Sequence, residues 1–212
     1  MTYIRGNVAE FDAWEQHGNP GWNWNALFPY FKKSEQYTIP TASQLAAGAT
    51  YESQYHGFAG PLHVGYTPAL ENGTYAPVVI DTFEGLSIAH NPDLNSGSVR
   101  GFGMGPQTLD AKLNIRFDSA RAYYQPAENR TNLKILQGTV KRITWAKGKD
   151  KNGAVVANGV EVLSDDGTST IINAKKEVVV SAGSLRTPLV LEASGIGNSR
   201  YVNPDWLGFS MR

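Results

Sequence analysis

Residues 177–197 read EVVVSAGSLRTPLVLEASGIG and contain the clearest structural pattern in the chain. The β-branched run at 177–181 is typical of a buried strand. Ala182-Gly183 interrupts the run, and apolar residues then recur at helical spacing up to a glycine that can end a helix. The stretch therefore predicts a strand, a glycine turn and a helix over about 185–194. In an open α/β sheet, such a turn lies where ligands bind.

Small, hydroxyl and aliphatic residues occupy fixed positions within this stretch. They are Gly183, Ser184, Thr187, Pro188, Val190, Leu191, Ser194, Gly195, Ile196 and Gly197. The pattern resembles the second signature of the glucose–methanol–choline (GMC) flavoprotein oxidoreductases. An ordinary strand–turn–helix unit with a glycine cap is the alternative, but the length of the pattern favours the family.

Two further segments resemble the same family. Residues 1–5, MTYIR, are similar to the end of its first signature, which lies against the flavin. Residues 18–35, GNPGWNWNALFPYFKKSE, resemble the branch that contains glucose oxidase and FAD-dependent glucose dehydrogenase. The family's G-x-G-x-x-G loop, which takes the pyrophosphate, does not occur in the chain. We therefore expect a central fragment of the family's fold.

A change of periodicity separates two parts of the sequence. From Leu133 the alternation of side chains has a period of two, which predicts a β-meander at 133–174 with a turn at Asp166-Gly167. The predicted fold class is mixed α/β (α+β), with this meander feeding the parallel-sheet strand at 177–181. The expected domains are a flavin-contacting segment with part of the substrate domain (1–132), the meander and strand–turn–helix of the FAD-binding domain (133–197) and a divergent tail (198–212).

The first part of the chain alternates helical patterns with loops. Helices are predicted at 7–17, 26–35, 75–86 and 118–124, strands at 62–66, 107–109 and 133–136, and a loop at 38–60. The glycine-rich run at 97–105 is interpreted as a turn and not as a phosphate loop, because no apolar strand precedes it and no helix follows it.

The resemblance implies FAD as the cofactor, with contacts at Thr2, Val140, Ala182 and Gly183. It also implies oxidation of a CH–OH group of a small alcohol or sugar, glucose-like in the nearest branch, by hydride transfer to the flavin. In the family a histidine pair or a His–Asn pair near the C-terminus accepts the proton, and no histidine here lies in a matching motif. The sequence thus gives no catalytic residue, and we expect the chain alone to bind FAD poorly and to be inactive.

Composition excludes several other classes of protein. Nineteen Lys and Arg balance nineteen Asp and Glu, so no basic surface indicates a nucleic-acid partner. The chain has no cysteine, and His56 and His63 are not at metal-ligand spacing, so no metal is expected. No apolar run approaches the ~20 residues of a membrane helix. The expected partner is the small-molecule substrate.

The protein is expected to be extracellular, and a secreted protein with a different function is the main alternative. Sequons at Asn72-Gly73-Thr74 and Asn129-Arg130-Thr131 favour an extracellular location, although such triplets also arise by chance. Trp22 and Trp24 leave open a non-catalytic carbohydrate-binding module that stacks sugar on both indoles. Packing within a helical core is the more frequent role of tryptophan at this spacing.

Overall fold

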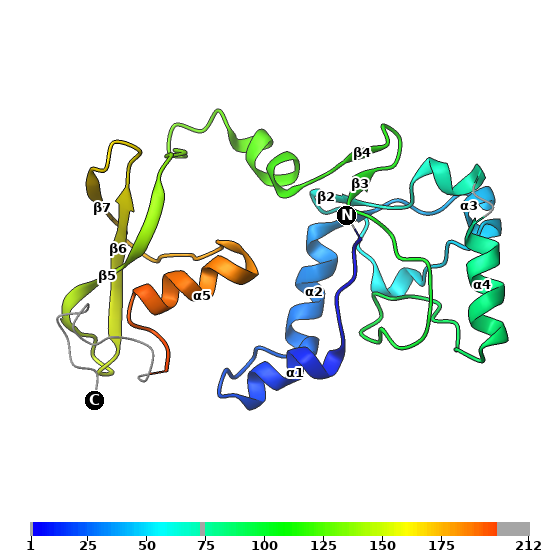
Figure 1. Cartoon of the computed structure of the whole chain (residues 1–212), viewed down its shortest axis with the longest axis horizontal. Helices are drawn as coiled ribbons and strands as arrows, with labels where there is room; N and C mark the ends of the chain where they lie inside the picture. The colour runs from blue at the N-terminus through cyan, green and yellow to red at the C-terminus, as the bar shows by residue number, and fades with distance from the viewer. Residues whose placement is uncertain (1, 73–74, 199–212) are drawn as a thin grey trace. The chain divides into compact units, whose positions relative to one another are not determined.

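The computed structural model describes residues 2–72 and 75–198. The chain divides into two compact units, residues 1–133 and residues 134–212, which are described separately (Figure 1). The assignment of 1–132 to flavin-contacting and substrate-domain segments and of 133–197 to the FAD-binding domain stays a prediction. The divergent tail at 198–212 lies, from residue 199 onward, outside the described residues.

Two consecutive helices open the first unit, as the sequence predicts. Helix α1, Val8–Gln16, begins after Asn7, whose backbone N–H donates to the Glu10 side chain at 3.0 Å. Helix α2, Trp24–Ser34, begins after Asn23, whose side chain accepts from a backbone N–H one turn on. Each side chain satisfies a backbone group that a helix end leaves unpaired, and this fixes where each helix starts.

Short strands and turns make up the rest of the first unit. Strand β1, Glu35–Tyr37, pairs in parallel with β2, Leu62–Val64. Strands β3, Leu109–Asp110, and β4, Ile115–Arg116, are antiparallel. The remaining elements are α3 (Ala42–Ala46), η1 (Ser53–Tyr55), η2 (Pro68–Asn72), α4 (Tyr75–Gly85), the π-helical turn η3 (Ala120–Tyr124) and η4 (Gln125–Ala127). In Figure 1, α2 lies on one side of this unit and α3 and α4 lie on the other.

The prediction of a loop over 38–60 is wrong in one part. Helix α3 forms there because Thr41 and Gln44 cap each other: the Thr41 hydroxyl accepts from the Gln44 N–H, and the Gln44 side chain accepts from the Thr41 N–H. This reciprocal pair is a recognised start signal for a helix. Its five residues are too few to produce a helical periodicity in the sequence.

The glycine-rich run allows close packing of the first unit. Gly97 has a φ of +91°, and a Cβ added there would lie 2.6 Å from Val8 and 2.9 Å from the Trp24 ring. Gly101 also has a left-handed φ, and its Cβ would lie 2.3 Å from the Ala89 carbonyl oxygen. These glycines therefore let a loop approach α1, α2 and a neighbouring backbone, which agrees with a turn and not with a phosphate-binding loop.

The second unit is a three-stranded antiparallel meander with one helix. Strands β5 (Thr139–Lys149), β6 (Val155–Leu163) and β7 (Ser169–Asn173) lie in the order β5-β6-β7. A turn with Gly167 at φ +82° joins β6 to β7, which confirms the predicted hairpin. Helix α5, Gly183–Ala193, follows and confirms the predicted helix. Figure 1 shows its last turn reaching the meander.

Two predicted strands are absent from the described residues. The run at 177–181 is irregular and Val179 is 76% exposed, because no described segment lies beside it to complete a ladder. Residues 133–136 are also irregular and exposed, and β5 begins only at Thr139, after Gly138 with a φ of +157°. Both runs have strand-like side chains, but a strand forms only where a partner accepts its hydrogen bonds.

Candidate functional site

The segment that contains Thr2 is attached to the first unit by its backbone. Thr2 forms an antiparallel bridge with Gln107, and the Tyr3 N–H donates to the Pro106 carbonyl oxygen at 2.8 Å. The Tyr3 carbonyl oxygen in turn accepts from the Asn95 side chain at 3.2 Å. The backbone of Tyr3 is therefore hydrogen-bonded at both its N–H and its carbonyl oxygen, while the Thr2 residue itself stays exposed.

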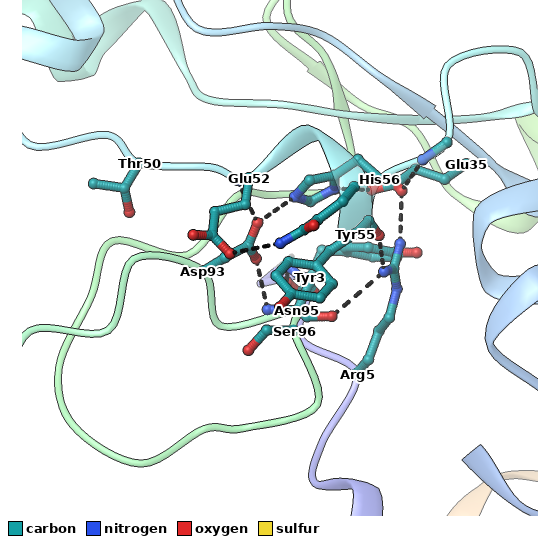
Figure 2. A network of polar contacts seen from close by, with 12 residues as sticks. Tyr3, Arg5, Glu35, Thr50, Glu52, Tyr55, His56, Asp93, Asn95 and Ser96 are labelled. Carbon is teal, nitrogen blue, oxygen red and sulfur yellow. Dashed lines mark hydrogen bonds and ion pairs between the residues drawn. The ribbon is translucent and has the colours of Figure 1, made fainter. Parts of the chain in front are cut away.

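A buried cluster of charged groups lies at the end of this segment (Figure 2). The Arg5 guanidinium donates to Glu35 Oε2 at 2.6 Å and also to the Tyr55 carbonyl oxygen. His56 lies between Glu35 Oε1, at 2.9 Å from Nδ1, and Asp93 Oδ2, at 2.8 Å from Nε2. All four charged side chains are nearly inaccessible, with at most 2% of the side chain exposed. We call Arg5, Glu35, His56 and Asp93 the buried ion cluster.

Sequence reasoning missed this cluster. The sequence indicated only that His56 is not at metal-ligand spacing, and it did not connect this histidine with Glu35 or Asp93. The members that contact each other directly stand 21 to 37 positions apart along the chain, so no local spacing joins them. The weak signal available was an ionisable residue, Glu35, directly after an aromatic-rich helix.

The geometry of the cluster supports a structural role and not proton transfer to a substrate. Both ring nitrogens of His56 already contact carboxylate oxygens, and the imidazole stacks on the Tyr37 ring at 3.8 Å between centroids. A general base needs a nitrogen within hydrogen-bond reach of the proton that it removes. His56 has none in this arrangement. Among residues 2–72 and 75–198, no group of three or more His, Asp or Glu could hold a metal ion either.

Ala182 and Gly183 form the turn that starts α5. Gly183 has a φ of +88°, a conformation that residues with a Cβ rarely adopt, and apart from its chain neighbours no described residue has an atom within 4 Å of the position its Cβ would take. No described chain segment approaches this backbone closely, so space is open beside it. Residues 181–186 are exposed, and Ala182 offers no side-chain acceptor to the helix, so the N–H groups of the first turn are available to a ligand.

Val140 lies in β5, and Ser194 connects this strand to α5. Val140 is 42% exposed. Three residues further on, the Ile143 N–H donates to Ser194 Oγ at 2.7 Å, and the Trp145 indole N–H donates to the Ser194 carbonyl oxygen at 2.9 Å. Ser194 is completely buried. The signature at 183–197 therefore also contains the contact that docks its helix on the strand of Val140.

Replacing Ser194 by alanine should destabilise the second unit. The change leaves the buried Ile143 N–H without its acceptor, and an unsatisfied buried donor costs about 1–3 kcal/mol. Urea unfolding of the whole chain measures this loss. Ser184→Ala is the control, because Ser184 is exposed in the first turn of the same helix. Equal midpoints for the two variants would contradict the docking role.

The four predicted contact residues belong to different units of the chain. Thr2 belongs to the first unit, whereas Val140, Ala182 and Gly183 belong to the second. Within the second unit, α5 and β5 meet through Ser194 at the C-terminal end of the helix, whereas Ala182 and Gly183 lie at its start. Contact of these four residues with a flavin stays a prediction.

The tryptophans do not form the double platform for sugar that the carbohydrate-binding alternative requires. Trp24 is buried, with 7% of its surface exposed, and it stacks on Phe28 at 5.1 Å between centroids. Trp22 is 56% exposed and lines a surface pocket of about 310 Å³ with Trp14 and Asn19. Trp24 is therefore part of the core, which removes one of the two indoles that the carbohydrate-binding alternative needs.

The fold and the signature agree with comparisons to known proteins. The sequence profile of the GMC oxidoreductase family matches residues 1–207. The chain therefore belongs to the GMC oxidoreductase family, whose cofactor is FAD. The match continues ten residues beyond Gly197, the point at which the resemblance was expected to stop.

Three relatives illustrate the family. The glucose oxidase-like protein fsoC of Humicola fuscoatra is 80% identical over 187 residues, which are 88% of this chain and 32% of that protein. Glucose oxidase of Aspergillus carbonarius is 35% identical over 201 residues, which are 92% of this chain and 32% of that protein. The solved structure of an FAD-dependent oxidoreductase from Chaetomium thermophilum is 32% identical in sequence and matches with a TM-score of 0.80. This match covers all of the present chain and 35% of the Chaetomium chain. The chain thus spans about a third of the relatives it matches.

No helix in the described parts of the chain is both long enough and apolar enough to span a membrane. The longest, α2, α4 and α5, have 11 residues each.

Proposed function

We propose that this chain forms part of an FAD-dependent oxidoreductase that acts on the CH–OH group of a small alcohol or sugar, with a glucose-like donor preferred. The observation that carries the proposal is the family match over residues 1–207. The names of the two curated relatives, glucose oxidase-like protein and glucose oxidase, support a sugar substrate. Because the chain spans about a third of each relative, the activity belongs to a longer polypeptide that includes these residues.

The turn at Ala182-Gly183 is the part of the chain best suited to hold the cofactor. Its backbone is exposed, the space beside Gly183 is open, and the first N–H groups of α5 suit an electron-rich or anionic group. Thr2 and Val140, both exposed, are the further contacts that we propose. When bound, FAD supplies the acceptor for the hydride removed from the alcohol carbon. The residues of this chain bind and orient it, and none of them is proposed as the proton acceptor.

The protein is also proposed to be extracellular. The sequon at Asn129 supports this, because Asn129 is exposed in a turn after η4, where a glycan can be attached. The other sequon, Asn72-Gly73-Thr74, lies in part outside the described residues.

Replacing Gly183 by valine should strongly reduce flavin content in a longer polypeptide that includes residues 1–212 and binds FAD. Valine disfavours the left-handed φ of +88° and places two methyl groups in the open space where the cofactor would lie. We expect a loss of bound FAD of about tenfold or more, measured by the visible absorbance of the purified protein.

Gly153→Val is the matched control for this experiment. Gly153 lies in the loop between β5 and β6, has a φ of +80° and has no atom within 4 Å of an added Cβ. The two variants therefore carry the same backbone strain in equally open space. Normal FAD content in Gly183→Val, or equal loss in both variants, would reject Gly183 as a cofactor contact.

A further inference from the structure

Hydrogen-bond geometry indicates that His56 is doubly protonated. Each ring nitrogen lies within 2.9 Å of a carboxylate oxygen, one from Glu35 and one from Asp93. An ionised carboxylate accepts hydrogen bonds but cannot donate them. Between two ionised carboxylates both ring nitrogens donate a hydrogen, so this arrangement indicates an imidazolium at His56 (Figure 2).

The charges inside the cluster then balance. Arg5 and His56 contribute two positive charges, and Glu35 and Asp93 contribute two negative charges. The other titratable groups that face His56 are the phenols of Tyr37, stacked on the imidazole, and of Tyr51, 6.5 Å away between ring centroids. Buried charges persist only when they are paired, so loss of the His56 proton would leave an excess negative charge in a site without water access.

The environment of His56 favours its charged form. Burial alone lowers the pKa of His56, but the hydrogen bonds to Asp93 and Glu35 raise the pKa above its ordinary value of 6.5. Asp93 responds in the opposite direction: burial raises its pKa, but the hydrogen bond from His56 and those from backbone N–H groups lower the pKa below the ordinary value.

His56 is connected to the segment over 2–5 by two routes. On one side, Glu35 binds His56 with Oε1 and Arg5 with Oε2. On the other side, Asp93 binds His56 with Oδ2 and the Asn95 N–H with Oδ1, and the Asn95 side chain donates to the Tyr3 carbonyl oxygen. Each carboxylate thus binds the imidazolium with one oxygen, and its other oxygen is connected by hydrogen bonds to the segment over 2–5.

We propose that His56, while doubly protonated, is a positioning residue that fixes the backbone of the segment carrying Thr2 through the Glu35–Arg5 and Asp93–Asn95–Tyr3 contacts. The link from this segment to FAD rests on the function proposed above. The positioning itself concerns only contacts within the chain.

The direction of the pH effect follows from the raised pKa. A group whose pKa is higher in the folded protein stabilises the fold fully below its unfolded pKa and loses that contribution as the pH rises through its folded pKa. The anchoring of residues 2–5 should therefore be complete below about pH 6.5 as long as Asp93 is ionised, and it should weaken as the pH rises through the folded pKa of His56.

Two measurements on the 212-residue chain test this. Nitrogen NMR of the histidine side chains between about pH 5 and about pH 9 should show one imidazolium that persists well above the ordinary titration range, assigned to His56 by its loss in His56→Gln. Hydrogen exchange, corrected for intrinsic rates, should show protection of the Tyr3 amide falling over the same pH range as that titration. Protection in β5–β7 should not follow it, which provides an internal reference.

The variant arm compares two histidines. His56→Gln should lower the protection of the Tyr3 amide about tenfold or more. His63 is a suitable comparison because it also stacks on an aromatic ring, Phe117, and its Nδ1 lies 3.5 Å from a carboxylate oxygen of Asp110. His63 is part-exposed and does not contact the buried ion cluster, so His63→Gln should leave the protection of the Tyr3 amide unchanged. Unchanged Tyr3 protection in a folded His56→Gln variant, or a neutral His56 near pH 6, would overturn the proposal. If His56→Gln does not fold, the wild-type pH series decides: Tyr3 protection independent of pH also overturns it.

The cofactor part is tested separately in a longer polypeptide that binds FAD. There His56→Gln should weaken FAD retention about tenfold, and His63→Gln should not. Loosening of the Tyr3 segment without a change in FAD retention would reject the link to the flavin. Absence of FAD from the wild-type polypeptide would instead contradict the proposed function, and the exchange data would still decide whether His56 positions the segment.

Discussion

Replacement of Glu35 by alanine should destabilise the first unit by about 3–5 kcal/mol, the range measured when one partner of a buried ion pair is removed. The Glu35 carboxylate is completely buried and accepts from Arg5, from the Gly57 N–H and from His56. Without it, the Arg5 guanidinium and the His56 imidazolium lie buried together with only Asp93 to balance them. Glu35→Gln should cost less, because the amide keeps the volume and one acceptor.

Glu161→Ala is the matched control for this change. Glu161 also accepts from three groups, the side chains of Lys141, Arg142 and Ser169, but the two cationic partners are about half exposed. Water and salt screen such a pair, so its loss should cost at most about 1 kcal/mol. Urea unfolding followed by far-ultraviolet circular dichroism compares the two variants. A Glu35→Ala loss no larger than that of Glu161→Ala would show that the buried ion cluster contributes little to stability.

Replacement of Gly57 by alanine should be similarly damaging for a steric reason. A Cβ on Gly57 would lie 1.7 Å from the Lys32 carbonyl oxygen and 2.6 Å from its carbonyl carbon. These are backbone atoms of α2, so no side-chain rotation can relieve the overlap. The two segments must move apart, which breaks the Gly57 N–H hydrogen bond to Glu35 and the hydrogen bond from the Tyr37 N–H to the Gly57 carbonyl oxygen. We expect a cost of ~3 kcal/mol or more, measured by the same unfolding experiment.

Gly85→Ala provides the contrasting case. Gly85 ends α4, and no atom lies within 4 Å of the position of its Cβ. Alanine is the better helix former and reduces the freedom of the unfolded chain, so this variant should be neutral or more stable by about 0.4–1 kcal/mol. Equal stability of the Gly57 and Gly85 variants would mean that the approach of residue 57 to α2 is looser than the structure indicates.

Elements whose structure is determined by residues close to them in the sequence were predictable. Helix α5 and the turn before β7 follow from local signals: apolar residues at helical spacing and a glycine with a left-handed φ. The run at 177–181 shows where such signals fail, because its β-branched residues indicate a strand whose partner has to come from another segment. Helix α3 was not predicted because its local signal is weak. That signal is a single pair of capping residues, Thr41 and Gln44.

The buried ion cluster was beyond sequence reasoning. Its members come from the first residues, from the start of β1 and from two loops, and only the fold brings them together. Residue type was also misleading, because an isolated histidine and scattered acidic residues are usually solvent-exposed. The family signatures, by contrast, identified the class of protein and its cofactor from a few residues at fixed spacing.

The contact of Ser194 with β5 also restricts the register of this strand. Its side-chain oxygen binds residue 143 and its main-chain oxygen binds residue 145, so the helix holds the strand at two points. A shift of β5 by one residue would turn every side chain to the opposite face of the sheet and break both hydrogen bonds at once. Strand β5 pairs with β6 with shifts of register between Val140 and Arg142, between Thr144 and Trp145 and between Trp145 and Lys149. Ser194 thus fixes the register of β5, and it keeps Val140 on a single face of the meander.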